Sequence, residues 1–232
     1  MGTTGAKLAP PASEKRKKSA GKKTQEPYIL PEWAFRAIRA GFGPVSRLLW
    51  GIEFHGAENV PESGGVIIAA NHQTYLDPFW IALRVPRPQR YLAWNEAFTW
   101  PLVGPALGAL GAWPLSLETI DPMPLRRAFK WLRKDGALVI FPEGGRCLSD
   151  GELMRFKSGA ARLALDARVP ILPITIRGAH RVWPRDYQVP RLHKVELFYH
   201  PLMYMQSRQG EDARACSLRE TQRLEQIIAS AL

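Results

Sequence analysis

The sequence predicts an α/β protein in which a mixed sheet carries helices on its faces. Short apolar runs that suit buried strands alternate with longer segments whose apolar residues recur every three or four positions, as in amphipathic helices. The chain has 232 residues, 46% of them hydrophobic, which is enough for one core and short for two independent domains. We therefore expect an α/β domain over residues 51–232, preceded by two different segments, 1–30 and 31–50.

Residues 1–30 form a basic tail that we expect to be disordered. The chain has a formal net charge of +11, and the tail's seven Lys and Arg against two Asp and Glu supply +5 of it. The tail has almost no apolar side chains to bury, so packing cannot offset the entropy of ordering it. It is either simply solvated or attracted to an anionic surface, membrane or nucleic acid, and we expect no specific nucleic-acid binding.

The N-terminus and the cysteines bear on the cellular compartment. No apolar run of the signal-peptide kind opens the chain, so secretion is not expected. Cys147 and Cys216 lie far apart in the sequence and have no metal-ligand neighbours. We therefore expect reduced thiols, a cytoplasmic setting and no metal site.

Residues 31–50 are predicted to form a broken amphipathic helix at a membrane interface. Aromatic and aliphatic residues alternate with three arginines, and Gly41, Gly43 and Pro44 interrupt the pattern. Rings at headgroup level and guanidinium groups against anionic lipid are typical of such segments. The alternative is a helix packed on the core of the domain.

The first half of the domain combines strands with one helix and one uncharged segment. Strands are predicted at 66–70, 91–94 and 113–115, and a helix at 79–84. Residues 97–117 carry no charge over a length that is enough to cross a bilayer. Three prolines and three glycines interrupt this segment, so we expect a buried helix–loop, a re-entrant element or an apolar wall instead of a span.

The second half of the domain repeats the alternation. The predicted elements are a helix from the Asp121 cap and Pro122 to Gly136, a strand at 137–141, a helix at 158–166, strands at 171–176 and 195–199, and a closing helix at 212–232. Ligands of open α/β sheets bind where strands end. Both polar motifs of this chain directly follow predicted strands.

The first motif is Asn71-His72-Gln73-Thr74-Tyr75-Leu76-Asp77, which follows the strand at 66–70. An imidazole accepts a proton near neutral pH, and a neighbouring carboxylate fixes its tautomer and stabilises the imidazolium. A spacing of five does not place two side chains on one helical face, so His72 and Asp77 must meet through a turn. A competing interpretation makes Asp77 the N-cap of a helix whose first turn contains Pro78; Asp77 can also serve both roles.

The second motif is Glu143-Gly144-Gly145-Arg146, which follows the strand at 137–141. Glycines let backbone N–H groups approach an anion, and an arginine is a forked donor suited to phosphate. Lys157, close to the start of the next predicted helix, adds charge to the same site. The alternative is a tight turn with a solvated arginine.

Together these motifs resemble those of the glycerolipid acyltransferase family, of the lysophosphatidic acid and glycerol-3-phosphate type. The matching residues are Asn71, His72 and Asp77 for the family's NHxxxxD, Phe141, Pro142, Glu143, Gly144 and Arg146 for its FPEGTRS, and residues 169–174 for its V-P-I-x-P-V-like strand. The chain departs from the family at Gly145, where threonine is common, and at Cys147, where serine is common. It also has Leu117 where the second block often has a basic residue.

The resemblance implies a glycerolipid acyltransferase-like α/β fold and an O-acyltransferase of phospholipid biosynthesis. His72 would be the general base and Asp77 its orienting partner. The substrate-binding residues would be Glu143, Gly144, Gly145, Arg146, Lys157 and Pro173, with the last shaping the pocket from below. Residues 97–117 would shelter the acyl chain.

The resemblance also implies the reactants and the place of the reaction. An acyl group would pass from acyl-CoA or acyl carrier protein, the co-substrate, to a lysophospholipid such as 1-acyl-glycerol-3-phosphate, which gives phosphatidic acid without a cofactor. The protein would lie at the cytoplasmic face of a membrane, as a peripheral or monotopic protein. The alternatives are an acyltransferase for another lysolipid, a catalytically weak membrane-binding module of the same fold, or a covalent route through Cys147 beside Arg146.

Overall fold

The structure is a computed structural model of the chain, and it describes residues 31–101, 103–115, 122–147, 152–184, 187 and 189–232. The predictions for the 1–30 tail, for Leu117 and for the Asp121 cap lie outside these residues.

A seven-stranded sheet in the order β1-β7-β6-β2-β5-β3-β4 forms the centre of the described chain. The strands are β1 Glu53–His55, β2 Val66–Ala70, β3 Gln89–Trp94, β4 Trp113–Leu115, β5 Ala137–Ile140, β6 Ile171–Arg177 and β7 Glu196–Tyr199. Neighbouring strands are parallel except β6 and β7, which pair antiparallel. The predicted mixed sheet is confirmed, and the predicted strands lie within a few residues of the observed ones.

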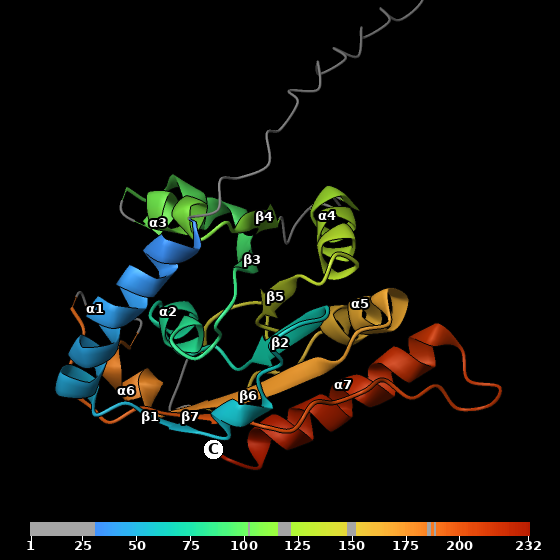
Figure 1. The fold of residues 1–232 in the computed structure, drawn as a ribbon. Coiled ribbons are helices and arrows are strands. Elements are labelled where there is room, and N and C mark those ends of the chain that lie inside the picture. The colour runs from blue at the N-terminus through green and yellow to red at the C-terminus, as the bar shows by residue number, and fades with distance from the viewer. Residues whose placement is uncertain (1–30, 102, 116–121, 148–151, 185–186, 188) are drawn as a thin grey trace, which may run out of the picture.

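Helices cover both faces of this sheet (Figure 1). They are α1 Glu32–Trp50, α2 Asp77–Ala82, α3 Val103–Ala109, α4 Pro122–Leu132, α5 Gly159–Ala167, α6 Ala179–Val182 and α7 Ala213–Ala229, with short 3-10 turns η1 Ala57–Asn59 and η2 Asn95–Thr99. Asp212 caps α7, since its carboxylate accepts from the N–H of Ala215 at 2.7 Å.

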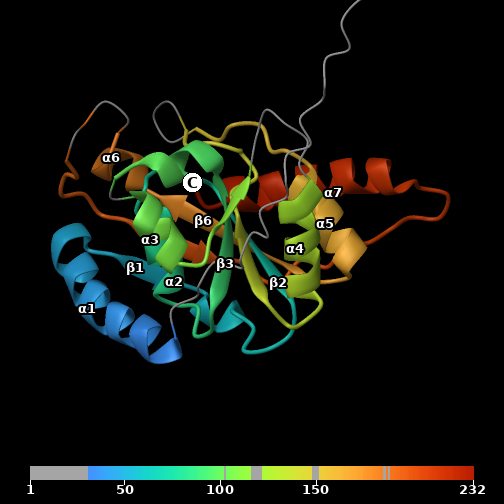
Figure 2. The ribbon, with the colours of Figure 1, turned by 90° about the horizontal axis from the view of Figure 1, so that it is seen from above.

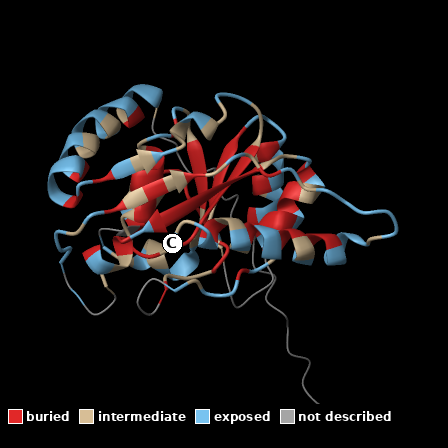
Figure 3. Ribbon diagram, turned by 90° about the horizontal axis from the view of Figure 1, so that it is seen from below, coloured by how far each residue is buried: buried red, intermediate tan, exposed pale blue. Residues whose placement is uncertain are grey.

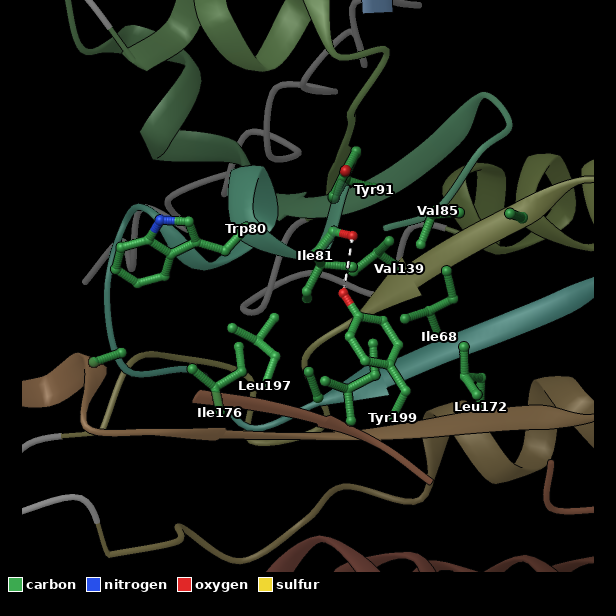
Figure 4. Close-up of a cluster of buried hydrophobic side chains, with 14 of the residues drawn as sticks. Ile68, Trp80, Ile81, Val85, Tyr91, Val139, Leu172, Ile176, Leu197 and Tyr199 are labelled. Atoms are coloured by element: carbon green, nitrogen blue, oxygen red, sulfur yellow. Dashed lines mark hydrogen bonds between the residues drawn. The ribbon is translucent and has the colours of Figure 1, made fainter. Parts of the chain in front are cut away.

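The core has two layers because successive side chains of a strand point to opposite faces. Ile68 of β2 belongs to the layer under α1 and α2, whereas Ile67 belongs to the layer under α4, α5 and α7. All five residues of β2 are buried, and the buried residues concentrate on the strands (Figure 3). In the first layer the Tyr199 hydroxyl donates to the Ile81 carbonyl at 3.3 Å, which ties β7 to α2 (Figure 4).

The helix α1 is continuous, so the prediction of a broken helix at 31–50 is wrong. Pro44 lies inside it, where a missing N–H and a ring clash cost about 3 kcal/mol. Phe35 and Trp50, on either side of Pro44, are both buried in the first layer. Their burial holds the two halves on the same surface, and Gly51 then ends the helix in the left-handed conformation with φ 50°.

The uncharged segment folds as short elements. Within residues 97–101 and 103–115 the chain forms the end of η2, then α3, then the edge strand β4. Leu110, Ala112 and Trp113 are buried. This agrees with the predicted helix–loop. Among the helices that the structure describes, none combines the length and the apolar character needed to cross a bilayer.

Candidate active site

The two motifs meet because the strands that precede them are neighbours. β2 pairs in parallel with β5 on one side and with β6 on the other (Figure 1). The carboxyl ends of parallel strands lie at the same edge of a sheet, so the loop after β2 and the turn after β5 leave it side by side. This places the 71–77 loop against the 141–147 turn.

His72 and Asp77 form the predicted pair, with 2.8 Å between His72 Nδ1 and Asp77 Oδ2. The Asp77 side chain is fully buried, whereas 17% of the His72 side chain is exposed. An ionised carboxylate only accepts, so Nδ1 carries the proton in this pair and Nε2 is left as the acceptor. The arrangement provides an imidazole base with a fixed tautomer.

The carboxylate of Asp77 also organises the loop that carries His72. Its Oδ2 accepts from the backbone N–H groups of Gln73 and Thr74 at 2.6 and 2.7 Å, and its Oδ1 accepts from the Thr74 hydroxyl at 2.9 Å. Gln73 and Thr74 are buried, so these groups need partners inside the protein. The turn through which the pair was predicted to meet is therefore built around Asp77.

The prediction of Asp77 as a helix N-cap is wrong. The helix α2 begins at Asp77, its N-cap residue is Leu76, and that end has no side-chain cap hydrogen bond. Pro78 lies in the first turn as expected. The reason for the difference is that the Asp77 oxygens accept from the preceding loop instead of from the first turn of α2.

The 141–147 turn holds the backbone and the ring of His72. The His72 N–H donates to Glu143 Oε1 at 2.7 Å, and the His72 carbonyl accepts from the Cys147 N–H at 2.8 Å. The imidazole stacks on the Phe141 ring, with 4.0 Å between centroids and 19° between planes. Sequence reasoning found Phe141 and Cys147 only as motif positions, because no local pattern shows these contacts.

Glu143 is a buried carboxylate that connects three segments. Its second oxygen, Oε2, accepts from the Met154 N–H at 2.9 Å, so the side chain joins the turn, the His72 loop and the segment before α5. Burial raises the pKa of the Glu143 carboxyl, against the lowering effect of the two backbone donors. Both oxygens are engaged with backbone N–H groups, which differs from the predicted contact with a phosphate.

Lys157 lies against Gly144 of the 141–147 turn. Gly144 has φ 74°, and a Cβ built there would be 2.5 Å from Lys157 Nζ. The backbone N–H of Lys157 donates to the Pro142 carbonyl at 2.9 Å, which fixes the approach of the two segments. A Cβ at Gly145 would meet nothing described within 4 Å, so this position has room for a β-carbon.

Arg146 is stacked on an aromatic residue of the His72 loop. Its guanidinium carbon lies 3.6 Å from the centroid of the Tyr75 ring. Tyr75 meets Trp100 and Trp183 edge to face, each at 5.6 Å between centroids. The loop that carries His72 therefore also provides the aromatic face that the Arg146 guanidinium contacts. Sequence reasoning missed these three aromatic residues, since they come together only in the fold.

Two amides hold the same loop to the end of β6 and to α6. The Asn71 side chain both donates to the Ile176 carbonyl at 2.8 Å and accepts from the Ile176 N–H at 2.7 Å. Gln73 Oε1 accepts from the His180 N–H at 3.1 Å. The loop is thus fixed by β5 on one side and by β6 on the other.

Pro173 lies within the sheet instead of in the loops of the site. It is a buried residue of β6 that pairs with Ala69 of β2, and its carbonyl accepts from the His200 N–H at 3.0 Å. In a strand the N–H and C=O of one residue point the same way, so the donor that proline lacks would face His200 and not β2. The β2–β6 ladder therefore keeps its hydrogen bonds.

One cluster of possible metal ligands occurs among the described residues, away from this site. Glu53, His55 and Glu196 lie on β1 and β7. Lys194 Nζ is 2.9 Å from Glu53 Oε2, and Arg177 Nη2 is 2.8 Å from Glu196 Oε2. Both carboxylates already have cationic partners in the protein, so this cluster does not fit a metal site well.

Comparison with known proteins identifies the family. The acyltransferase family profile matches residues 51–177. A chloroplastic 1-acyl-sn-glycerol-3-phosphate acyltransferase of Brassica napus is 31% identical over 175 residues, which are 69% of this chain and 49% of that protein. The 1-acyl-sn-glycerol-3-phosphate acyltransferase of Streptococcus pneumoniae is 32% identical over 143 residues, which are 59% of this chain and 52% of that protein. The chain thus spans about half the length of these relatives.

A solved structure has the same fold. The crystal structure of the 1-acyl-sn-glycerophosphate acyltransferase PlsC from Thermotoga maritima superposes with a TM-score of 0.70 at 23% identity, over 86% of this chain and 79% of that one. The profile match covers more than half of the chain and includes both motifs. The protein belongs to the acyltransferase family.

Proposed function

We propose that the protein is an O-acyltransferase that transfers a fatty acyl group from a thioester to the hydroxyl of a lysophospholipid. The donor is acyl-CoA or acyl carrier protein, the acceptor 1-acyl-glycerol-3-phosphate, and the product phosphatidic acid. The observation that carries the proposal is the His72–Asp77 pair, at 2.8 Å, beside a turn that contains Arg146 and against which Lys157 lies. The names of the relatives from Brassica napus and Streptococcus pneumoniae support the choice of acceptor.

In the proposed reaction His72 is the general base. Its Nε2 takes the proton of the acceptor hydroxyl while the oxygen attacks the thioester carbonyl, and Asp77 stabilises the imidazolium. The tetrahedral intermediate then expels the thiolate, which takes the proton back from His72 and leaves as a thiol. A positioned base of this kind contributes about 10²–10⁴ in rate. The acyl donor is the only co-substrate that these steps consume.

The acceptor's phosphate is bound by Arg146 of the turn and by Lys157, which lies against Gly144. Arg146 offers a planar fork of donors and Lys157 a point charge. Glu143 is assigned a positioning role, because its two oxygens already accept from His72 and Met154. The acyl chain lies against the apolar segment of η2 and α3. Removing the chain from water there contributes about 0.8 kcal/mol of binding free energy per buried methylene.

The place of the reaction is the cytoplasmic face of a membrane, to which the protein binds peripherally or monotopically. Exposed apolar residues and arginines of α1 support this assignment. Neither Cys147 nor Cys216 forms a disulfide, which agrees with a reducing compartment.

Acyl transfer by the purified protein tests the proposal. Protein, long-chain acyl-CoA and a panel of lysolipids and glycerol phosphate are mixed, and thiol release is followed together with mass spectrometry of the products. His72→Ala is expected to lower kcat by about 10²–10⁴, and Asp77→Asn by a similar factor. The double variant is expected to be no slower than His72→Ala, because the two residues act as a unit.

The melting temperature of each variant is measured as the control for folding. Acylation that persists unchanged in His72→Ala, or no acylation of any acceptor by the wild type, would refute the enzyme assignment. Loss of turnover in Cys147→Ser together with a trapped acyl–protein adduct in the wild type would replace the direct transfer by the covalent route.

A further inference from the structure

We propose that the segment following α6 forms, together with the C-terminal half of α1, one surface that binds an anionic phospholipid bilayer. This docking surface consists of Val45, Leu48 and Leu49 of α1 and of Val189 and Leu192 beyond α6. The inference rests on the proposed function, since it names a second membrane contact for the same protein.

The residues of the docking surface are large, apolar and exposed. Leu48 is 85% exposed, Leu192 74%, Val189 68% and Val45 46%. Scattered surface hydrophobics are ordinary in soluble proteins, but a group of them indicates a contact site. With about 100° of rotation per residue, Val45, Leu48 and Leu49 lie within an arc of about 100° on α1. That arc adjoins the face that α1 buries through Phe35 and Trp50.

Hydrogen bonds hold the two parts of the surface side by side. The Trp50 indole N–H donates to the Arg191 carbonyl at 3.0 Å, and the Val195 N–H donates to the Trp50 carbonyl at 3.0 Å. Leu48 and Leu49 directly precede Trp50, and Leu192 directly follows Arg191. In both views the segment beyond α6, in orange, runs beside the C-terminal end of α1, in blue (Figures 1 and 2).

The charges of the surface suit anionic headgroups. Arg47 and Arg191 are exposed among these apolar residues, and the Arg191 guanidinium lies 3.4 Å from the Tyr187 ring centroid. The neighbouring carboxylates Glu53 and Glu196 are paired with Lys194 and Arg177. Apolar side chains, arginines and an amphipathic ring form the composition of interfacial segments, so a bilayer is the occupant that fits.

The same segment reaches the candidate active site. It starts just after Trp183, whose ring meets Tyr75 of the His72 loop at 5.6 Å between centroids. The Arg191 N–H donates to the Val182 carbonyl at 2.7 Å, which ties Arg191 to the end of α6. A bilayer bound to the docking surface would therefore lie on the side of the molecule where Trp183 contacts the His72 loop.

Vesicle binding by the full-length protein tests the inference. Co-sedimentation is measured with phosphatidylcholine vesicles with and without a quarter of phosphatidylglycerol. The double variant Val189→Ser/Leu192→Ser is expected to bind the anionic vesicles at least about tenfold more weakly than the wild type, and Leu48→Ser likewise. Leu192→Trp is expected to bind at least as tightly as the wild type, because a tryptophan keeps the contact and prefers the interface.

Leu218→Ser is the matched control. Leu218 is 47% exposed on α7, which lies on the other side of the molecule from α1 (Figures 1 and 2). This variant should bind within about twofold of the wild type. The double variant should also acylate a short-chain acceptor dissolved below its micelle concentration at the wild-type rate, with reduced activity only on acceptor held in vesicles.

The outcomes separate this inference from the proposed function. Wild-type vesicle binding by the double variant would refute the docking surface. So would a smaller assembly of the double variant than of the wild type in size-exclusion chromatography without any change in vesicle binding, because the surface would then join copies of the chain. His72→Ala should bind vesicles like the wild type. A protein that binds through this surface but acylates nothing would support the docking surface and refute the activity.

Discussion

At the scale of single residues, His72, the proposed base, is held in place by its surroundings. Asp77 holds the ring nitrogen, Glu143 and Cys147 hold the backbone, and Phe141 covers one face of the ring. The sequence predicted the first contact because the two residues are close in the chain. The other three depend on β2 lying beside β5, which local patterns do not determine.

The stacking of Arg146 on Tyr75 gives a prediction about acceptor binding. Tyr75→Leu removes the aromatic face but not the cation, so we expect KM for 1-acyl-glycerol-3-phosphate to rise about two- to thirtyfold, from a cation–π contribution of about 0.5–2 kcal/mol. Tyr75→Phe should stay close to the wild type. Steady-state kinetics with the phosphate acceptor and with a monoacylglycerol that lacks phosphate measure the effect.

The monoacylglycerol is the control for that prediction. If KM for both acceptors rises equally in Tyr75→Leu, the residue shapes the site in general and does not position the phosphate-binding arginine.

The two adjacent glycines of the turn are expected to differ in their tolerance of a side chain. Gly144 has φ 74° and lies under Lys157, so Gly144→Ala introduces about 1–2 kcal/mol of backbone strain and displaces the ammonium. We expect a fall in melting temperature of about 2–8 °C and a higher KM for the acceptor. Gly145 has open space around it and an ordinary φ, so Gly145→Ala should change neither the melting temperature nor KM. Equal effects of the two substitutions would contradict this explanation.

At the scale of secondary-structure elements, α1 shows tertiary packing overriding local preference. Gly41, Gly43 and Pro44 are poor helix formers, and the sequence accordingly predicted a broken helix. The helix is continuous because Phe35 and Trp50 are buried on the same layer of the core. Strands such as β2 and β5 were predicted correctly, since an apolar run buried on both faces is a local signal.

The proline of α1 gives a stability prediction. Pro44 is exposed, so Pro44→Ala restores a backbone hydrogen bond without disturbing the core. We expect the free energy of unfolding to rise by about 1–3 kcal/mol, measured by urea denaturation monitored by circular dichroism. Ala40→Gly, on the same helix, should lower it by about 1 kcal/mol. No gain from Pro44→Ala would mean that the helix carries no strain at this residue.

At the scale of the whole molecule, one half-buried histidine links the stability of the fold to pH. His200 follows β7, and burial lowers its pKa from the ordinary value of 6.5. The Thr175 hydroxyl donates to the Ile228 carbonyl at 2.6 Å, so the contact of 2.8 Å with His200 Nε2 requires that Nε2–H donates. The sheet, α7 and a neutral histidine are thereby joined.

The sign of the pH effect follows from proton binding. Between the lowered pKa of His200 in the folded protein and 6.5, the unfolded chain binds a proton more readily than the folded protein does, so stability falls as the pH decreases through this range. His200→Gln keeps an N–H donor without titrating, and its melting temperature should depend less on pH between about 7 and 5 than that of the wild type. Identical pH profiles of the two proteins would show that His200 is not the group involved.

The sequence by itself determined the fold class and the chemistry of the two motifs. Hydrophobic periodicities of two and 3.6 residues can be read from short stretches of sequence, and so can the spacing of His72 and Asp77. The expected reaction came from the resemblance of the motifs to a known family. Only the tertiary structure decided what holds these groups. Tyr75, Trp100 and Trp183 come from three separate segments of the chain. The residues that hold the backbone and ring of His72 come from the turn after the neighbouring strand β5. Both sets of contacts depend on strand order and packing, which no local pattern contains.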